Sequence, residues 1–260
     1  MLKSFLKNCA VILLSLFLIS NCWAGIDFDG VDDYVDLINL AETSSGSFSM
    51  WIKPSVNIDS NSQIGLFNNG TVDIESIIVR WYGALGALDF YITDGDWVTA
   101  QTTTTSWTGG VWYYIVGTWN GTNIKIYING QLQDSELQGS PVTKTGNWHI
   151  GLAGLSTTPL YFPGLIDEVT IWNVALTQTE IDLLYNSKIK GMPLQIRPAN
   201  LVLYCPIDDQ ETGTSADGDI VRDLSGNGNN GTGVDGANNT GLAWVGESVL
   251  SYPPKIGNWE

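Results

Sequence analysis

Apolar and polar residues alternate with a period of two over long parts of this sequence. In NIKIYING (residues 123–130) isoleucines take every second position, and Lys125 and Tyr127 fall between them. This alternation is typical of a strand with one buried and one exposed side. Asn-Gly pairs at 120–121 and 129–130 bracket the stretch, and such pairs accept the positive φ of two-residue hairpin turns. The pattern therefore predicts consecutive antiparallel strands.

The same signal recurs along the chain and favours an all-β fold. We predict further strands at residues 62–67, 73–82, 86–92, 97–104, 147–152 and 160–172. Many short strands at even spacing favour two packed antiparallel sheets. One helix is predicted at 177–187, because Thr177 and Glu180 form a capping-box pattern and apolar residues follow at a spacing of three and four.

Residues 1–24 have the pattern of a cleaved export signal. Lys3 and Lys7 precede an apolar run at 10–19, and Cys22 and Ala24 place small residues at the cleavage positions. The run is shorter than the roughly 20 residues that a bilayer span needs. Lipoprotein processing before Cys22 is an alternative that Asn21 disfavours. We expect a secreted or cell-surface protein.

Charge limits the partners that such a protein can have. Removal of residues 1–24 leaves nine basic residues against 27 acidic ones, a net charge of −18. A polyanion repels phosphate backbones and anionic membranes, so we expect no nucleic acid and no stable membrane insertion. Cys205 is then the remaining cysteine, and its alternation with Leu201 and Leu203 predicts burial. Nothing in the sequence predicts an oligomeric state.

Three segments, in this order, resemble the laminin-G-like, concanavalin A-like jelly-roll family. They are FDGVDDYVDL (residues 28–37), YYIVGTWNGTNIKIYINGQLQ (113–133) and YFPGLIDEVTIWNVALTQTEIDLLY (161–185). The resemblance covers about residues 26–187. It implies an all-β fold, an antiparallel two-sheet jelly-roll sandwich with one short helix.

The C-terminal part allows two domain arrangements. LVLYCPIDDQETGTSADGDIVRDLSGNGNNGT (residues 201–232) resembles a segment that often precedes FDG in such domains, but here it comes last. Residues 191–260 either complete the sandwich formed by 25–190 or begin a truncated second domain. We favour the first, because the termini of a domain often lie close together and a lone strand is not stable.

Two groups of acids are candidates for a cation site. Asp29, Asp32 and Asp33 surround a glycine that predicts a turn, and Asp167 and Glu168 lie on a later strand. The resemblance implies that these two strands are neighbours. Clustered hard oxygen ligands in an exported acidic protein suggest Ca²⁺. The alternative is that the acids are solvated edge charges that prevent sheet-to-sheet aggregation.

The tail holds a second acidic segment. Aspartates and asparagines alternate there with glycines, at Asp217, Asp219, Asp223, Asn227 and Asn229. These residues could wrap a cation, but Asn, Asp and Gly are also common turn formers. We favour the turn interpretation.

Four aromatic residues near predicted turns are candidates for ligand binding: Trp81, Tyr82, Trp97 and Trp107. Exposed aromatic rings bind sugars through the C–H face of the pyranose. The alternative is that the tryptophans fill the core of a large sandwich.

No catalytic constellation is predicted. His149 is the single histidine, and the sequence holds neither a G-x-S-x-G motif nor the spaced acids of β-glucanases on one strand. We therefore predict an exported non-catalytic binding module for carbohydrate or glycoprotein, in which Ca²⁺ could assist. A protein–protein adhesion or coat module is the first alternative, and a glycosidase with an unrecognised site is the second.

Overall fold

A computed structural model of the protein describes most of the chain after the predicted export signal. The described residues are 25–37, 40, 44–69, 77–82, 85–93, 97–138, 147–155, 158–187, 189–207, 215–235 and 242–245. Residues 1–24, and with them the predicted signal, lie outside this part. Within it, no helix has the length and apolar character needed to span a membrane.

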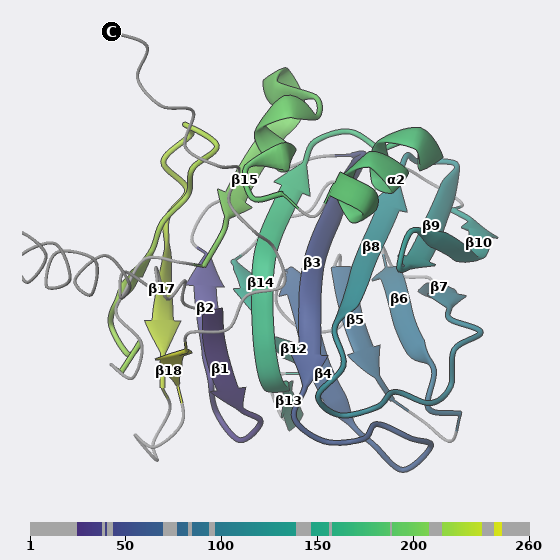
Figure 1. Ribbon diagram of the computed structural model, residues 1–260. Coiled ribbons are helices and arrows are strands. Elements are labelled where there is room, and N and C mark those ends of the chain that lie inside the picture. The colour runs from purple at the N-terminus through teal and green to yellow at the C-terminus, as the bar shows by residue number, and fades with distance from the viewer. Residues whose placement is uncertain are drawn as a thin grey trace, which may run out of the picture.

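Two antiparallel sheets, A and B, stack on each other (Figure 1). Sheet A runs in the order β10 (Gln131–Leu137), β9 (Asn123–Ile128), β8 (Tyr113–Trp119), β3 (Gly46–Pro54), β14 (Pro163–Trp172), β1 (Gly25–Asp29) and β18 (Ala243–Val245), with β15 (Leu201–Cys205) also paired to β14. Sheet B runs in the order β16 (Ile220–Val221), β17 (Gly231–Val234), β2 (Tyr34–Leu37), β11 (Trp148–Ile150), β4 (Ile64–Asn69), β5 (Ile77–Trp81), β6 (Leu88–Thr93) and β7 (Trp97–Gln101). A hairpin of β12 (Leu152–Leu155) and β13 (Thr158–Tyr161) completes the strands. The predicted all-β, two-sheet sandwich is confirmed.

The core lies between the inner faces of the two sheets. Phe48 of sheet A contacts Phe67 and Phe90 of sheet B, with ring centroids 4.9 and 5.4 Å apart. Gly117 on β8 leaves the space for this ring, because a Cβ there would come within 2.2 Å of Phe48 Cε1. Each fully buried aromatic ring contributes about 2–3 kcal/mol, so this cluster is a main source of cohesion between the layers.

The central hairpins follow the predicted strands and turns. β8, β9 and β10 pair in sequence order, and both residues of the second turn have positive φ, at 52° for Asn129 and 78° for Gly130. Two other predicted strands are divided in the structure. The one at 147–152 is interrupted at Gly151, whose φ is 83°. The one at 160–172 is divided at Phe162 into β13 and β14.

Strands from both ends of the described chain share one edge of β14. β1 pairs with its first half, up to Ile166, and β15 pairs with its second half, from Val169. Asp167 and Glu168 lie between them at a register shift, and Glu168 has a φ of 54°. β17 pairs with β2 and β18 pairs with β1. The C-terminal strands thus lie in both sheets, while the domain boundaries themselves stay a prediction.

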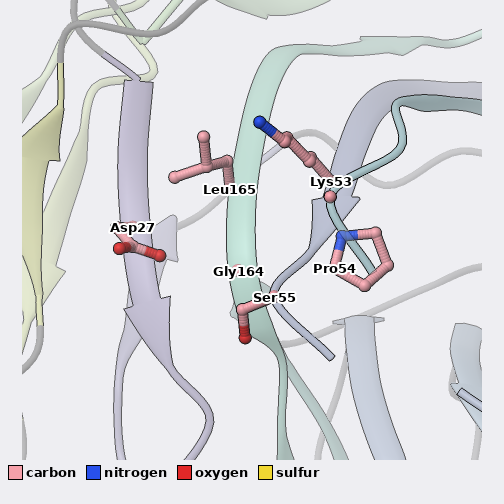
Figure 2. Close-up of a pocket in the computed structure, with 7 residues that line it drawn as sticks. Asp27, Lys53, Pro54, Ser55, Gly164 and Leu165 are labelled. Carbon is pink, nitrogen blue, oxygen red and sulfur yellow. The ribbon is translucent and has the colours of Figure 1, made fainter. Parts of the chain in front are cut away.

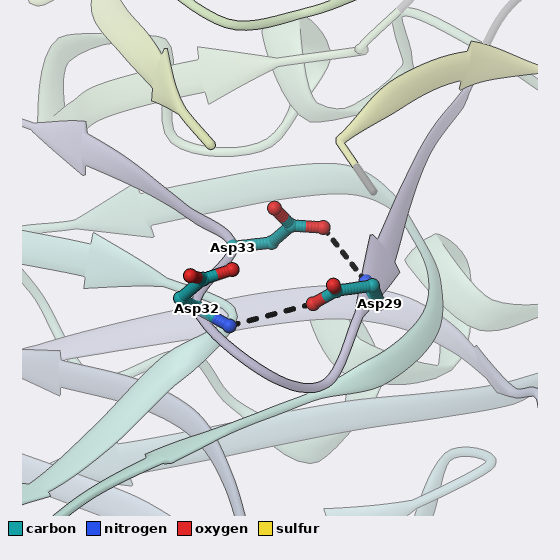
Figure 3. Close-up of side chains that lie close together, drawn as sticks. All are labelled: Asp29, Asp32 and Asp33. Atoms are coloured by element: carbon teal, nitrogen blue, oxygen red, sulfur yellow. Dashed lines mark hydrogen bonds between the residues drawn. The ribbon is translucent and has the colours of Figure 1, made fainter. Parts of the chain in front are cut away.

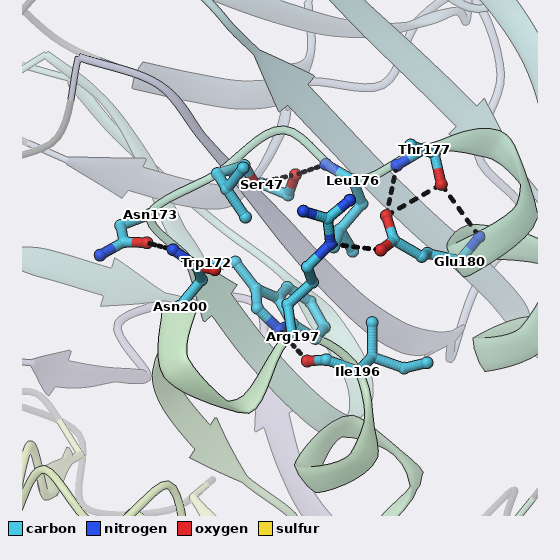
Figure 4. Close-up of polar contacts among 10 residues, drawn as sticks. Ser47, Trp172, Asn173, Leu176, Thr177, Glu180, Ile196, Arg197 and Asn200 are labelled. Atoms are coloured by element: carbon cyan, nitrogen blue, oxygen red, sulfur yellow. Dashed lines mark hydrogen bonds and ion pairs between the residues drawn. The ribbon is translucent and has the colours of Figure 1, made fainter.

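The predicted helix is α2 (Gln178–Ser187), which covers the outer face of sheet A. Its capping box is confirmed, since the Thr177 amide and hydroxyl both donate to Glu180 Oε2, at 2.8 and 2.9 Å (Figure 4). Arg197, which precedes the short 3-10 helix η2 (Pro198–Asn200), donates to Glu180 Oε1. Trp172 Nε1 donates to the carbonyl of Ile196 at 3.0 Å, close to η1 (Met192–Gln195). Figure 4 shows how these bonds hold the segment after the helix, residues 189–200, against α2 and β14; we call this segment the connector.

The tail loop is held by its own hydrogen bonds. Asp223 Oδ1 accepts the Tyr204 amide at 3.0 Å, and its Oδ2 accepts the Asn229 amide at 2.9 Å. Asn227 Nδ2 donates to the carbonyls of Leu201 and Val202. These bonds attach the loop to β15, as the turn interpretation predicts for Asp223, Asn227 and Asn229. Cys205, as predicted, is buried.

Candidate functional site

The turn between β1 and β2 gathers three carboxylates (Figure 3). Asp29, Asp32 and Asp33 each offer an oxygen within 4.8 Å of the others. Gly30 makes the turn possible, because its φ is 80° and a Cβ would lie 2.8 Å from Pro163. Asp29 Oδ1 accepts the Val31 amide at 2.7 Å, and Asp33 Oδ2 accepts the Asp29 amide at 2.7 Å. The acids of the opening segment are therefore preorganised in a short loop, which we call the acid loop (residues 29–33).

Asp33 is the buried member of the acid loop. Its side chain is fully shielded from solvent, and its Oδ1 has no hydrogen-bond partner among the described residues. Burial, followed by the charges of Asp29, Asp235 and Asp32, raises the pKa of Asp33 to about 7, against the opposing hydrogen bond from the Asp29 amide. A cation would offset both the burial and the repulsion. These oxygen donors fit a hard divalent cation such as Ca²⁺.

Asp167 and Glu168 are not part of this cluster. The implied neighbourhood of their strands is confirmed, but β1 pairs with β14 in a register that places Asp29 opposite Pro163. Asp167 lies four residues further along β14, about 13 Å away at 3.3 Å per residue. The expectation that all five acids share one site is therefore wrong.

Asp167 and Glu168 instead surround a buried lysine. Lys190 Nζ lies 3.5 Å from Asp167 Oδ1 and 3.5 Å from Glu168 Oε1, and it donates to the Pro206 carbonyl at 3.3 Å. The Tyr204 hydroxyl donates to Glu168 Oε2 at 2.9 Å. This network joins β14 to the connector and β15, so its role is structural.

Two of the four predicted binding aromatics are in the core. Trp81 and Trp107 are both fully buried and contact each other edge to face, 5.2 Å between centroids. Trp81 follows Ile77 and Val79 on the inner face of β5. Trp107 Nε1 donates to the Gly86 carbonyl at 3.1 Å. The expectation that these rings lie on an exposed rim is wrong, and the alternative of core packing holds for both.

Tyr82 and Trp97 remain exposed and belong to one continuous group. Each is 51% exposed. The Arg80 guanidinium lies 4.3 Å from the Tyr82 ring centroid and 4.9 Å from that of Tyr91, and Tyr91 contacts Trp97 edge to face at 5.2 Å. Alternation on β5, β6 and β7 places Arg80, Tyr91 and Trp97 on the outer face of sheet B, and Tyr82, which directly follows β5, contacts Arg80 there. We call Arg80, Tyr82, Tyr91 and Trp97 the aromatic row.

A second group on the same outer face is polar. Asp36, His149 and Asn68 are direct cross-strand partners on β2, β11 and β4, and we call them the polar row. His149 Nε2 lies 3.7 Å from Asp36 Oδ1. Asp36 Oδ1, Asn68 Oδ1 and His149 Nδ1 are shielded from solvent and have no hydrogen-bond partner within the described part of the chain. Burial lowers the pKa of His149, and Asp36 partly opposes this shift.

The β12–β13 hairpin lies across the face between the two rows. Gly65 on β4 permits this approach, since a Cβ there would come within 2.1 Å of the Leu160 carbonyl oxygen and 2.3 Å of the Ala153 nitrogen. Ala153 packs with Ile78 and Tyr91. Ile78 is the residue between Asn68 and Tyr91 in the cross-strand register. The hairpin thus separates the polar row from the aromatic row.

A shallow hollow on sheet A is a weaker candidate. Asp27, Leu165 and Lys53 line it from three adjacent strands, next to Pro54 and Ser55 (Figure 2). Burial, and then the charge of Asp29, raises the pKa of Asp27. None of the described residues that line this hollow is aromatic. It therefore lacks a ring on which a sugar could stack.

The sequence signals for these groups differ in strength. The acid loop and the exposed pair Tyr82 and Trp97 were visible as residue types near turns. Arg80 was missed, although it is two residues before Tyr82 in the sequence. Asp235 was missed because nothing local connects it to Asp33.

Known proteins share this fold. A family model described as the concanavalin A-like lectin/glucanases superfamily matches residues 29–182, more than half of the chain. A putative carbohydrate binding protein from Bacteroides ovatus ATCC 8483 aligns with a TM-score of 0.58 and 21% identity, over 81% of this chain and 58% of that protein. A heptameric SAP-like pentraxin from Limulus polyphemus aligns with a TM-score of 0.51 and 15% identity, over 65% of this chain and 84% of the pentraxin.

At these identities the solved structures establish a common fold and no more. This chain spans little more than half of the Bacteroides ovatus protein. A search of curated protein sequences found no match. The extent of the family match, together with the two-sheet sandwich, shows that the chain belongs to the concanavalin A-like lectin/glucanases superfamily.

Proposed function

We propose that this protein is a non-catalytic carbohydrate-binding module whose ligand stacks on the aromatic row. The observation that carries the proposal is the aromatic row itself. Tyr82 and Trp97 are each half exposed, lie on one face of sheet B and are connected through Arg80 and Tyr91. Rings held by their neighbours lose little conformational entropy when a ligand binds.

The chemistry of the row suits a sugar. An aromatic ring presents a negative face to the weakly positive C–H groups of a pyranose. The Arg80 guanidinium supplies N–H donors for hydroxyl or carboxylate oxygens. The oxygens of Asp36 and Asn68 in the polar row that have no partner among the described residues are shielded from solvent, so the proposal rests on the aromatic row alone.

The comparisons support the same class of function. The Bacteroides ovatus protein is described as a putative carbohydrate binding protein, and this likeness is one of fold. The superfamily description names both lectins and glucanases. We propose binding without hydrolysis, because the acids on the described strands of sheet B, Asp36 on β2 and Asp89 on β6, are separated by β11, β4 and β5, farther apart than the paired carboxyl groups of a glycosidase. We also propose that the protein acts outside the cell, as the pattern of residues 1–24 suggests.

We further propose that the acid loop holds Ca²⁺. Asp29, Asp32 and Asp33 would supply carboxylate oxygens, and the orphaned Oδ1 of Asp33 is the observation that favours a cation. The ion would neutralise the mutual repulsion of the loop and tie β1 of sheet A to β2 of sheet B. Its contribution would be structural, since the aromatic row lies on different strands.

A glycan array followed by titration calorimetry tests the carbohydrate proposal. The wild-type protein should bind at least one glycan class, and Trp97→Ala and Tyr82→Ala should each weaken that binding by about 5-fold to 150-fold, as loss of about 1–3 kcal/mol of stacking implies. Leu183→Ala is the matched control, because Leu183 is also 51% exposed but lies on α2 over sheet A.

Two results would contradict this proposal. One is binding that Trp97→Ala and Leu183→Ala affect equally. The other is release of reducing sugar from a bound polysaccharide, which would make the protein a glycosidase. If no glycan binds and a protein from the native cell surface binds through the same face, the adhesion alternative replaces the carbohydrate proposal.

A further inference from the structure

Strands from the two ends of the described chain meet at the acid loop. β17 pairs with β2 so that Val234 lies opposite Tyr34. In this antiparallel register the next residue, Asp235, comes opposite Asp33 of the acid loop. A residue about 200 positions away in the sequence thus stands beside the buried carboxylate of the turn.

Asp235, like Asp33, has a shielded carboxylate oxygen, Oδ1, without a hydrogen-bond partner among the described residues. The backbone amide of Asp235 is held by Asp217 Oδ1 at 3.1 Å. Asp33 and Asp235 thus each keep a shielded carboxylate oxygen to which no described residue donates a hydrogen bond, which is costly unless something neutralises the charge.

The acid loop by itself offers few protein oxygens to a cation. Ca²⁺ takes six to eight oxygen ligands, and carboxylates from separate segments commonly contribute. Asp29 Oδ1 and Asp33 Oδ2 already accept backbone amides. A further carboxylate with an unused oxygen at the edge of the loop would raise both the ligand count and the negative charge of the site.

We propose that Asp235 is an additional ligand of the Ca²⁺ site, so that the cation clamps the C-terminal strand β17 to the N-terminal acid loop. This inference rests on the proposed Ca²⁺ site at Asp29, Asp32 and Asp33. The C-terminal segment then has a function in metal binding. The ion joins Asp235 at the end of β17 to the acid loop, two parts of the chain that meet only through the pairing of β17 with β2. Removal of the metal then loosens β17 before the rest of sheet B.

Calorimetric titration of the chelator-treated protein with CaCl₂ tests the clamp. We expect the wild-type protein to bind one Ca²⁺ and Asp235→Asn to bind it at least 10-fold more weakly. Asp217→Asn is the matched control. It removes one negative charge from the same C-terminal segment, and the amide oxygen of the new side chain can still accept the Asp235 amide. This control should bind within about 3-fold of wild type. Asp29→Asn should abolish binding.

Hydrogen exchange gives a second readout on the same samples. Ca²⁺ should slow exchange of the amides in residues 231–235 of the wild-type protein by at least 10-fold, and Asp235→Asn should lose this protection. Exchange of β8 should not change in either protein. Faster exchange of the β8 amides would show that Asp235→Asn is partly unfolded. In that case Asp235→Glu is titrated with CaCl₂ instead, and we expect it to retain part of the Ca²⁺ binding.

The outcomes separate the two proposals. Tight Ca²⁺ binding by wild type and Asp235→Asn alike, with equal protection of 231–235, overturns the clamp and leaves the site at the acid loop. No binding by wild type overturns the acid-loop site and the clamp together. If Asp29→Asn binds Ca²⁺ as tightly as wild type, the ion binds elsewhere in the protein. That result overturns both the acid-loop site and the clamp.

Discussion

Replacement of Asp33 by Asn should stabilise the metal-free protein, although it removes a proposed metal ligand. Asp33 is fully shielded, and its pKa is raised from 3.8 to about 7 by burial and by neighbouring carboxylates. At about 1.4 kcal/mol per pKa unit, keeping this group ionised in the folded state costs up to about 4 kcal/mol. Relaxation of the loop reduces this value, so we expect a gain of about 2–4 kcal/mol for Asp33→Asn.

The sign of the pH dependence follows from the direction of the shift. A carboxyl whose folded-state pKa is raised contributes stability below its unfolded pKa of about 4 and loses it as the pH rises toward about 7. Asp33→Asn lacks this titration, and its amide oxygen can still accept the Asp29 amide. The stability difference between variant and wild type should therefore be largest above pH 7 and nearly vanish at pH 4.

Urea unfolding followed by tryptophan fluorescence measures this difference, with EDTA present, at pH 4 and pH 7.5. Asp217→Asn serves as the exposed control and should change the free energy of unfolding by less than about 0.5 kcal/mol. Saturating Ca²⁺ should then reverse the order, because wild type gains stability from the ion and Asp33→Asn does not. The reasoning is refuted if Asp33→Asn is no more stable than wild type in EDTA at pH 7.5.

Three further substitutions test the surrounding structure by the same unfolding measurement. Lys190→Met should cost about 3–5 kcal/mol by leaving two buried carboxylates uncompensated, and Glu168→Gln in the same chain should restore part of it; an effect below 1 kcal/mol would contradict the buried network. Wild type should lose stability as the pH falls below about 6.5, because burial lowers the folded-state pKa of His149 and the unfolded chain takes up the proton first. His149→Gln should reduce this loss, and an unchanged dependence of stability on pH would show that His149 is not shielded. Gly65→Ala should cost about 1–3 kcal/mol and increase exchange of amides in 152–155, since its Cβ would meet the hairpin backbone; wild-type stability would mean that the hairpin does not lie on β4.

Short-range patterns in the sequence were reliable guides. The alternation in NIKIYING and its flanking Asn-Gly turns predicted β9 and its hairpins, and the Thr177–Glu180 capping box predicted the start of α2. The clustering of acids in the acid loop could also be predicted from the sequence, because its three carboxylates fall within five residues around one glycine. In each case the interacting groups are close in sequence, so backbone geometry alone brings them together.

The choice between neighbouring aromatics could not be read in this way. Trp81 and Tyr82 are adjacent, and β5 carries apolar residues on both faces because the β12–β13 hairpin covers Ile78. Alternation therefore separates the two side chains but does not say which one faces the core. Packing of the second sheet placed Trp81 against Trp107 and left Tyr82 exposed.

From its own residues the sequence settles the class of fold, the turns and the local gathering of acids, since these depend on neighbours a few positions apart. Tertiary structure alone assigned Asp167 and Glu168 to Lys190, and it alone brought Asp235 beside Asp33. Those assignments arise from the register of strands far apart in the chain. A shift of one residue in such a register turns every side chain to the opposite face, and only the packing of both sheets selects one register.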